Sequence, residues 1–130
     1  MPPLSRLMYL LGALGMLSAV ALGAFAAHGL RARLPPDSLA IFKTGVEYHF
    51  YHALGLFAVA QLAARTPSSR LVRWGGVLLA AGIPLFSGTL YLLALSGVRA
   101  WALVTPFGGI AWLAGWALIA LALWRHREQG

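Results

Sequence analysis

LMYLLGALGMLSAVALGAFAA, residues 7–27, runs for 21 positions without a charged side chain. As an α-helix this run would be about 32 Å long, enough to cross a hydrocarbon core of about 30 Å. It also exceeds the roughly 7 to 15 apolar residues of a signal peptide. We therefore expect residues 7–27 to be a membrane-spanning helix.

The rest of the chain has the same apolar character. Of its 130 residues, 60% are hydrophobic and only 10% are charged, whereas an average soluble domain has roughly 25% charged residues. The chain contains no cysteine, which excludes disulfides, thiolate metal ligands and cysteine nucleophiles. No linker rich in serine, glycine or charge divides the sequence, so we predict an integral membrane protein that forms one domain.

Charged residues and helix breakers divide the chain into four apolar spans. The first covers residues 7–27, the second about 39–64 after Pro35 and Pro36, the third about 71–95 with Pro84 inside it, and the fourth about 106–124. The connections are short, which favours antiparallel neighbours. We predict an all-α polytopic membrane protein with four transmembrane helices in a compact antiparallel bundle, a single domain over residues 1–130.

The basic residues predict the orientation. The net charge is +7, but its cations lie between the spans rather than on one helical stripe, which indicates lipid-headgroup contacts and no nucleic-acid partner. The side with both termini would hold Arg6, Arg65, Arg70, Arg73, Arg125 and Arg127, and the other side Arg31, Arg33, Lys43 and Arg99. Six against four favours cytoplasmic termini, and we expect the bacterial cytoplasmic membrane.

Small residues at intervals of about one helical turn predict close packing between helices. In lipid, burying apolar side chains gains little, so helices associate where small residues let their backbones approach. The predicted packing positions are Gly15, Ala19, Gly23, Gly76, Ala80, Gly88, Gly108 and Gly115. Pro84 has no amide hydrogen, so we expect it to kink the third span and free a carbonyl, which Ser87 or Gly88 would help to accommodate.

Polar side chains gather near the outward ends of the spans. Ionisable groups inside a membrane cost energy unless they have partners, so they mark candidate sites. Tyr48, His52 and Gly55 share one helix face, which we expect to look into the bundle, and His49 is interpreted as facing the lipid headgroups. The predicted polar pocket consists of His28, Glu47, Tyr48, His52, Ser87, Tyr91 and Thr105.

Structural roles for the same groups stay open. His28 would cap the first helix at the headgroups, the tyrosines would anchor the interface, and His52 would be satisfied by one hydrogen bond inside the bundle. Glu47 would pair with Lys43, Arg31 or Arg33 in a salt bridge that orients its helix.

Four segments resemble a known family. LGAFAAHGL (22–30), VEYHFYHALGL (46–56), LFSGTLYLLALSG (85–97) and TPFGGIAWLAGW (105–116) are similar, in order, to the signature blocks of the domain-of-unknown-function 423 / transmembrane protein 256 family. The resemblance implies a small four-span membrane protein of no established activity. The positions that match the family pattern are His28, Glu47, Tyr48, His52, Ser87, Gly88, Tyr91, Thr105 and Pro106. Position 49 departs from it, because members commonly have glutamine there.

Three functions fit these residues. The first is a non-enzymatic membrane protein that acts through lipid or protein contacts, a second copy of the chain included, with the polar cluster as a brace. The second is a small proton-linked carrier or channel in which Glu47 and His52 titrate. The third is a metal or haem site at His28 and His52, with Glu47 as a further ligand. We predict no cofactor, and no nucleophile motif or phosphate loop indicates an enzyme.

Overall fold

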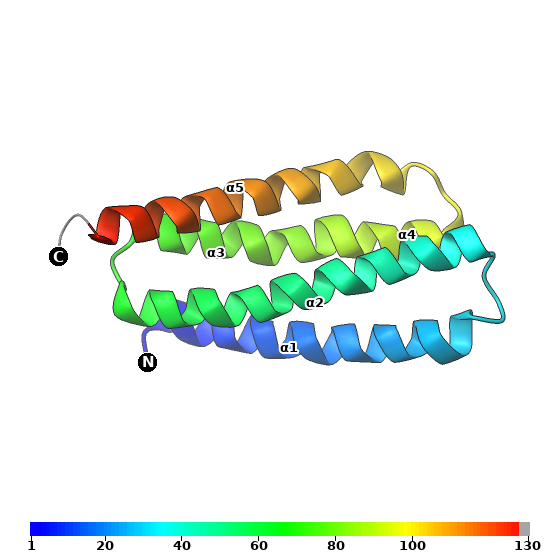
Figure 1. Cartoon of the computed structure of the whole chain (residues 1–130), viewed down its shortest axis with the longest axis horizontal. Helices are drawn as coiled ribbons and strands as arrows, with labels where there is room; N and C mark the ends of the chain where they lie inside the picture. The colour runs from blue at the N-terminus through cyan, green and yellow to red at the C-terminus, as the bar shows by residue number, and fades with distance from the viewer. Residues whose placement is uncertain (128–130) are drawn as a thin grey trace.

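The computed structural model describes residues 1–127, without the side chain of Arg127, and over this range it consists of helices and the turns that join them (Figure 1). The chain forms α1 (Pro3–Phe25), the π-helical η1 (Ala26–Leu30), α2 (Pro36–Arg65), α3 (Arg70–Gly82), the π-helical η2 (Ile83–Gly88), α4 (Thr89–Ser96) and α5 (Trp101–Arg127). Because η1 continues α1, and η2 joins α3 to α4, these elements make four rods.

Local signals explain where the helices begin and end. Prolines stand at the first positions of α1 and α2, where a missing amide hydrogen costs nothing. Ser69 caps α3, with its hydroxyl oxygen accepting from the Val72 amide at 3.3 Å. Gly97 ends α4 in the left-handed conformation, at a φ of 69°, which glycine adopts readily.

The four rods run antiparallel, and the start of α1 and the end of α5 lie at the same end (Figure 1). α1 packs against α2, and α5 packs against α3, η2 and α4. α2 also contacts α3, η2 and α4, so α2 and the third rod form the centre of the bundle, while α1 and α5 flank it. This arrangement leaves two lateral grooves, one beside α1 and one between α2 and α5.

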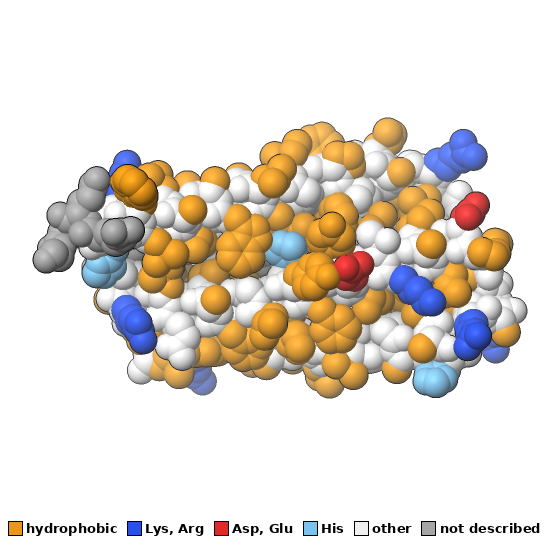
Figure 2. Space-filling model, in the orientation of Figure 1, with side chains coloured by type: hydrophobic (Ala, Val, Ile, Leu, Met, Phe, Trp, Pro, Cys, Tyr) orange, Lys and Arg blue, Asp and Glu red, His pale blue; other side chains and the backbone are white. Residues whose placement is uncertain are grey.

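The surface has the pattern of a membrane protein. On the face that Figure 2 shows, apolar side chains cover the middle of the bundle and Lys and Arg lie toward its two ends. The segments Pro3–Leu30, Arg70–Ser96 and Trp101–His126 are long and apolar enough to cross a membrane. α2 lies outside this set, but it has 30 residues, or about 45 Å at 1.5 Å per residue, and runs beside the other rods. We therefore treat α2 as the fourth spanning helix.

Two apolar clusters form the interior. One, nearer the termini, contains Met8, Leu56 and Leu79 among its buried members. The other, nearer the loops that follow α1 and α4, contains Phe42 and Val46. The α2 segment between Val46 and Leu56 therefore separates the clusters, and it carries His49 and His52.

Most of the predicted packing positions lie at close helix contacts. A Cβ added at Gly15 would lie 2.9 Å from the Ala53 Cβ, one at Gly76 3.0 Å from the Met8 sulfur, and one at Gly115 3.1 Å from the Gly75 carbonyl oxygen. Gly23 faces Val46, Gly108 lies against the Phe86 backbone, Ala19 is fully buried, and Ala80 packs against the core. Gly88 differs, because an added Cβ there would meet only the Pro84 Cβ, at 3.8 Å.

Pro84 changes the hydrogen bonding of the third rod. The Ile83 amide, which would bond to the Leu79 carbonyl in a regular α-helix, bonds to the Ala80 carbonyl, and Pro84 has no amide hydrogen to donate. The free Leu79 carbonyl accepts from the indole Nε1 of Trp112 on α5, at 3.0 Å. The expectation that Ser87 or Gly88 would accommodate this carbonyl was wrong.

Candidate functional site

His52 has both ring nitrogens engaged. Its Nδ1 lies 2.8 Å from the Tyr48 carbonyl oxygen, one turn earlier on α2, and its Nε2 lies 3.1 Å from the indole Nε1 of Trp116. A carbonyl only accepts and an indole only donates, so Nδ1 carries the proton and Nε2 accepts. These partners select the neutral ring with one fixed tautomer, because a second proton on Nε2 would face the indole N–H.

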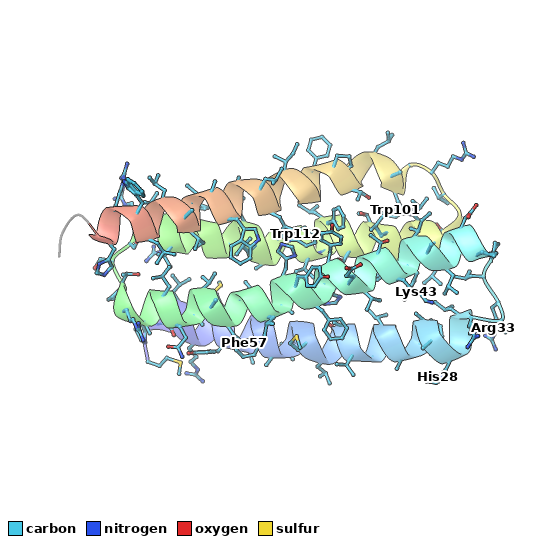
Figure 3. All side chains as sticks on the ribbon, viewed as in Figure 1. His28, Arg33, Lys43, Phe57, Trp101 and Trp112 are labelled. Carbon is cyan, nitrogen blue, oxygen red and sulfur yellow. The ribbon has the colours of Figure 1, made fainter. Side chains whose placement is uncertain are left out.

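Aromatic side chains enclose this histidine. The His52 ring stacks on Trp112 with ring centroids 3.6 Å apart and planes 2° apart. Phe86 lies against the same indole with centroids 4.7 Å apart. Glycines make room for the two indoles, since a Cβ at Gly82 would overlap Trp112 and one at Gly55 would lie 3.0 Å from Trp116. In Figure 3, Trp112 lies near the middle of the bundle.

A lateral groove opens over these rings, between α2 and α5. It has a volume of about 530 Å³ and is lined by Tyr48, His52, Phe86, Pro106, Gly109, Ile110, Trp112, Leu113 and Trp116. We call it the His52 groove. Gly109 leaves space in it, because a Cβ added there would meet only the Phe86 ring, at 3.9 Å. The groove therefore presents an almost wholly apolar surface to the bilayer.

His49 joins three rods. Its Nε2 lies 3.1 Å from the Ser18 hydroxyl on α1, and its Nδ1 lies 2.8 Å from the Tyr91 hydroxyl on α4. The interpretation of His49 as a headgroup-facing side chain was wrong, since the residue is only 5% exposed. Its face of α2 is turned toward α1 and α4. Each hydroxyl can donate or accept, so these contacts permit two arrangements of the protons.

Ser18, His49 and Tyr91 form a hydrogen-bonded triplet, and this triplet is the polar floor of a second groove. It has a volume of about 300 Å³ and is lined by Leu11, Leu14, Gly15, Ser18, His49, Leu56, Ala80, Ile83, Pro84, Gly88 and Tyr91. We call it the His49 groove. Apart from its three polar side chains the lining is apolar, so the groove combines a hydrophobic wall with a few hydrogen-bonding groups, as small-molecule sites do.

The structure divides the predicted polar pocket into separate places. Thr105 pairs with Thr89, with the two hydroxyl oxygens 2.7 Å apart. Ser87 is fully buried, and its hydroxyl has no hydrogen-bond partner among the described residues. Tyr91 belongs to the His49 triplet, and Tyr48 lines the His52 groove.

Glu47 and His28 also lie apart from His52. The Glu47 carboxylate is exposed and accepts from the Tyr51 hydroxyl at 2.6 Å, so its partner is a tyrosine and not the predicted Lys or Arg. His28 is exposed at the loop end of α1, far along the bundle from Trp112, on which His52 stacks (Figure 3). Within residues 1–127, no group of three or more potential metal ligands lies together.

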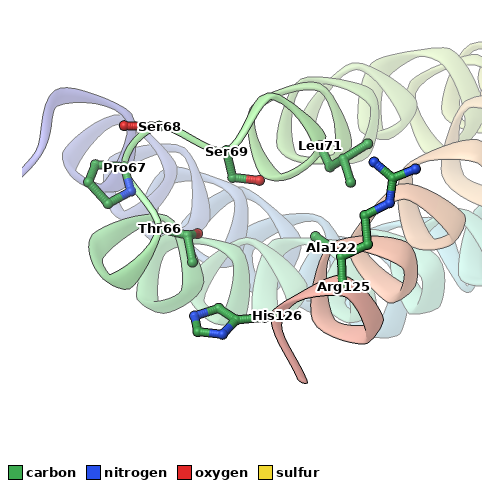
Figure 4. A pocket seen from close by; sticks show the side chains of 8 residues that line it. All are labelled: Thr66, Pro67, Ser68, Ser69, Leu71, Ala122, Arg125 and His126. Atoms are coloured by element: carbon green, nitrogen blue, oxygen red, sulfur yellow. The ribbon is translucent and has the colours of Figure 1, made fainter. Parts of the chain in front are cut away.

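A third hollow lies at the end that carries the termini. It has a volume of about 330 Å³ and is lined by Thr66, Pro67, Ser68, Ser69, Leu71, Ala122, Arg125 and His126 (Figure 4). The two basic side chains come from the last turns of α5, and the hydroxyls come from the turn between α2 and α3. The hollow thus lies at the level of a headgroup region, away from both lateral grooves.

Sequence reasoning missed Ser18, Thr89 and the roles of the two indoles. Trp112 and Trp116 are four residues apart, so they share a face of α5, and this spacing is a signal for a paired aromatic wall. Ser18 lies 31 residues before His49, and only the packing of α1 on α2 brings them together.

Comparisons with known proteins point to a family of membrane proteins. The sequence model of a family described as a protein of unknown function (DUF423) matches residues 22–109. The chain is 45% identical over 117 residues to the UPF0382 membrane protein YwdK of Bacillus subtilis, covering 90% of this chain and 95% of that one. It is 42% identical over 126 residues to the UPF0382 inner membrane protein YgdD of Escherichia coli K12, covering 97% and 95%. No solved structure gives a significant match.

Proposed function

Since the chain belongs to the DUF423 family, whose relatives described above are bacterial membrane proteins, we propose that it is a non-enzymatic membrane component that acts through contacts with lipid. The contact is a lipid acyl chain held in the His52 groove. The observation that carries this proposal is the pairing of an apolar lateral groove with a floor histidine whose two nitrogens are already engaged. The histidine ring therefore offers an incoming molecule packing surface and no free ring nitrogen.

Close packing is the main interaction that can hold an acyl chain against a protein in a bilayer. Lipid chains are as apolar as leucine, so a chain enters a protein groove only where its dispersion contacts are better than those among other chains. Flat rings supply many such contacts, and the His52 groove is bordered by Phe86, Trp112 and Trp116.

The buried polar groups support a bracing role over a proton relay. A carrier that uses Glu47 and His52 requires a proton to pass between them. Glu47 accepts from Tyr51 on the exposed side of α2, whereas His52 is bound to the Tyr48 carbonyl and to Trp116 inside the bundle. The two residues have separate partners, which favours the non-enzymatic proposal over the carrier. A metal site at His28 and His52 is disfavoured because His28 lies far along the bundle from Trp112, on which His52 stacks (Figure 3).

Native mass spectrometry of the protein released from nanodiscs tests the lipid contact. The wild-type chain is expected to retain a phospholipid adduct, and Gly109→Leu is expected to lose it, because the new side chain fills the groove from a position with free space. The matched control is Ala58→Leu, which adds bulk at an exposed position of α2. Equal retention by all three proteins, or no adduct on the wild type, would refute the proposal. The same spectra report whether two copies associate.

The proposed location is the bacterial cytoplasmic membrane with both termini inside. Six basic residues on the terminal side against four on the other support this orientation. Fusions of alkaline phosphatase test it: a fusion after Gly130 is expected to be inactive, and one inserted between Arg33 and Leu34 is expected to be active. The reverse pattern would place the termini outside.

A further inference from the structure

We propose that the His49 groove binds a lipophilic carbonyl compound, of which a quinone is the type, with the Tyr91 hydroxyl donating to its carbonyl oxygen. This site is separate from the proposed acyl-chain contact in the His52 groove and does not depend on it. The inference rests on the ambivalent partners of His49, on the apolar wall of the groove and on the depth at which its polar floor lies.

In the first arrangement of the protons, no hydrogen-bond donor of the triplet is free to meet a ligand. The Ser18 hydroxyl oxygen lies 2.9 Å from the Leu14 carbonyl oxygen and 3.0 Å from that of Gly15. When Ser18 donates to these carbonyls it accepts from His49 Nε2–H, and Nδ1 then accepts from Tyr91. Every hydrogen-bond donor of the triplet is then used, so the groove has no free donor for the oxygen of an incoming molecule.

The second arrangement frees a donor without moving a heavy atom. Ser18 donates to His49 Nε2, Nδ1–H donates to the Tyr91 oxygen, and the Tyr91 hydrogen becomes available. In an apolar groove an unpaired O–H is costly, so this arrangement is stabilised by a molecule that brings an acceptor. His49 thereby couples the hydroxyl on α1 to the donor that a ligand meets on α4.

The depth of the triplet selects the kind of carbonyl. His49 follows Lys43 by six residues on α2, which places it about 9 Å farther along the helix axis. Lys43 lies toward the loop end of the bundle, where the cations gather (Figures 2 and 3). Phospholipid ester carbonyls stay at the edge of the hydrocarbon core, whereas a quinone head on an apolar tail enters the core. The apolar lining residues, such as Leu11 and Ile83, would surround that tail.

The binding of decylubiquinone tests the proposal. The full chain is placed in nanodiscs made from ether-linked phospholipids, which contain no ester carbonyls, and is titrated by calorimetry. The wild type is expected to bind decylubiquinone and to bind decylbenzene, which has the tail without carbonyl oxygens, at least about threefold more weakly, the effect of one lost hydrogen bond. No binding of decylubiquinone, or equal binding of the two probes, would refute it.

Paired variants identify the donor. Tyr91→Phe keeps the ring that packs on Phe42 at a centroid distance of 4.7 Å and is expected to weaken decylubiquinone binding about threefold to tenfold. Tyr51→Phe, the matched control, removes a hydroxyl outside the groove and is expected to bind as the wild type does. Unchanged affinity in Tyr91→Phe would overturn the assignment of the donor.

Two further arms locate the site and the source of the carbonyl. Gly88→Leu fills the His49 groove from an open position and is expected to abolish binding, with Ala58→Leu as its control; binding that survives in a folded Gly88→Leu protein refutes the location. In nanodiscs of ester phospholipids the affinity for decylubiquinone is expected to stay within about threefold. A tenfold or greater loss would show that ester carbonyls occupy the site and would refute the quinone-type ligand.

Discussion

His49 and His52 lie three residues apart on α2, both are less than a tenth exposed, and each has both ring nitrogens hydrogen-bonded. Their partners differ. His52 meets a carbonyl and an indole, which fix its tautomer, whereas His49 meets two hydroxyls, which leave it a choice. Burial and a full set of hydrogen bonds therefore do not decide whether a histidine can respond to a ligand. The response depends on whether its partners can both donate and accept hydrogen bonds.

The largest expected effect is the difference in stability between the alanine variants of His52 and His49. His52→Ala removes the ring that stacks on Trp112 and leaves the Trp116 N–H unpaired, so we expect a loss of about 3–5 kcal/mol. His49→Ala leaves the Ser18 hydroxyl its bonds to the Leu14 and Gly15 carbonyls and deprives only the Tyr91 hydroxyl of its partner, and we expect about 1–2 kcal/mol. The midpoint of thermal unfolding in detergent measures both. Equal losses of stability would contradict the difference between the two histidines.

A substitution that keeps the stacked ring separates the contribution of stacking from that of the hydrogen bond to Trp116. His52→Phe retains a flat ring against Trp112 but removes the acceptor for Trp116, and we expect a loss of about 1–3 kcal/mol, between wild type and His52→Ala. The same thermal measurement applies. Wild-type stability in His52→Phe would mean that the Trp116 hydrogen bond contributes nothing and that the His52 site is held by packing alone.

The Trp112 indole supports the His52 site and also binds the third rod. Trp112→Phe keeps an aromatic ring near His52 and removes the donor to the Leu79 carbonyl, so we expect a loss of about 1–2 kcal/mol. Faster amide hydrogen exchange in residues 79–83 should accompany it. Trp124→Phe is the control, because Trp124 is 65% exposed. Equal effects of the two substitutions would contradict the role of the Leu79 bond.

The smallest effect tests a polar group that belongs to neither histidine. The Ser87 hydroxyl is buried without a partner, so Ser87→Ala is expected to raise stability by up to about 1 kcal/mol. Its counterpart is Ser5→Ala, which deletes a buried bond from the Ser5 hydroxyl to the Ala60 carbonyl, at 2.9 Å, and is expected to cost about 1 kcal/mol. Opposite signs in thermal unfolding confirm the distinction, and a destabilised Ser87→Ala contradicts it.

The sequence predicted the class and architecture because those follow from composition and periodicity. Membrane spans need long apolar runs, and short connections force neighbouring helices to run antiparallel. The shared face of Tyr48 and His52 was also predictable, since a four-residue spacing brings side chains together on any helix.

The grouping of the polar residues was not predictable from depth alone. Each residue turns a helix by about 100°, so Glu47, His49 and His52 point in three directions although they lie within two turns. Glu47 consequently meets Tyr51, His49 meets α1 and α4, and His52 meets α5. Which neighbour stands in each direction depends on the packing of rods distant in sequence, and a single sequence does not contain that information in local form.

The bond between Trp112 and the Leu79 carbonyl bears on how the protein is made. Helices enter the membrane in chain order during synthesis, so the third rod arrives before α5. Until α5 follows, Leu79 presents an unpaired carbonyl, which hydrocarbon cannot satisfy. We expect the third rod to stay at the insertion machinery, in contact with water, until the fourth emerges. The two would then pass into the bilayer together, as a hairpin whose last helix completes the one before it.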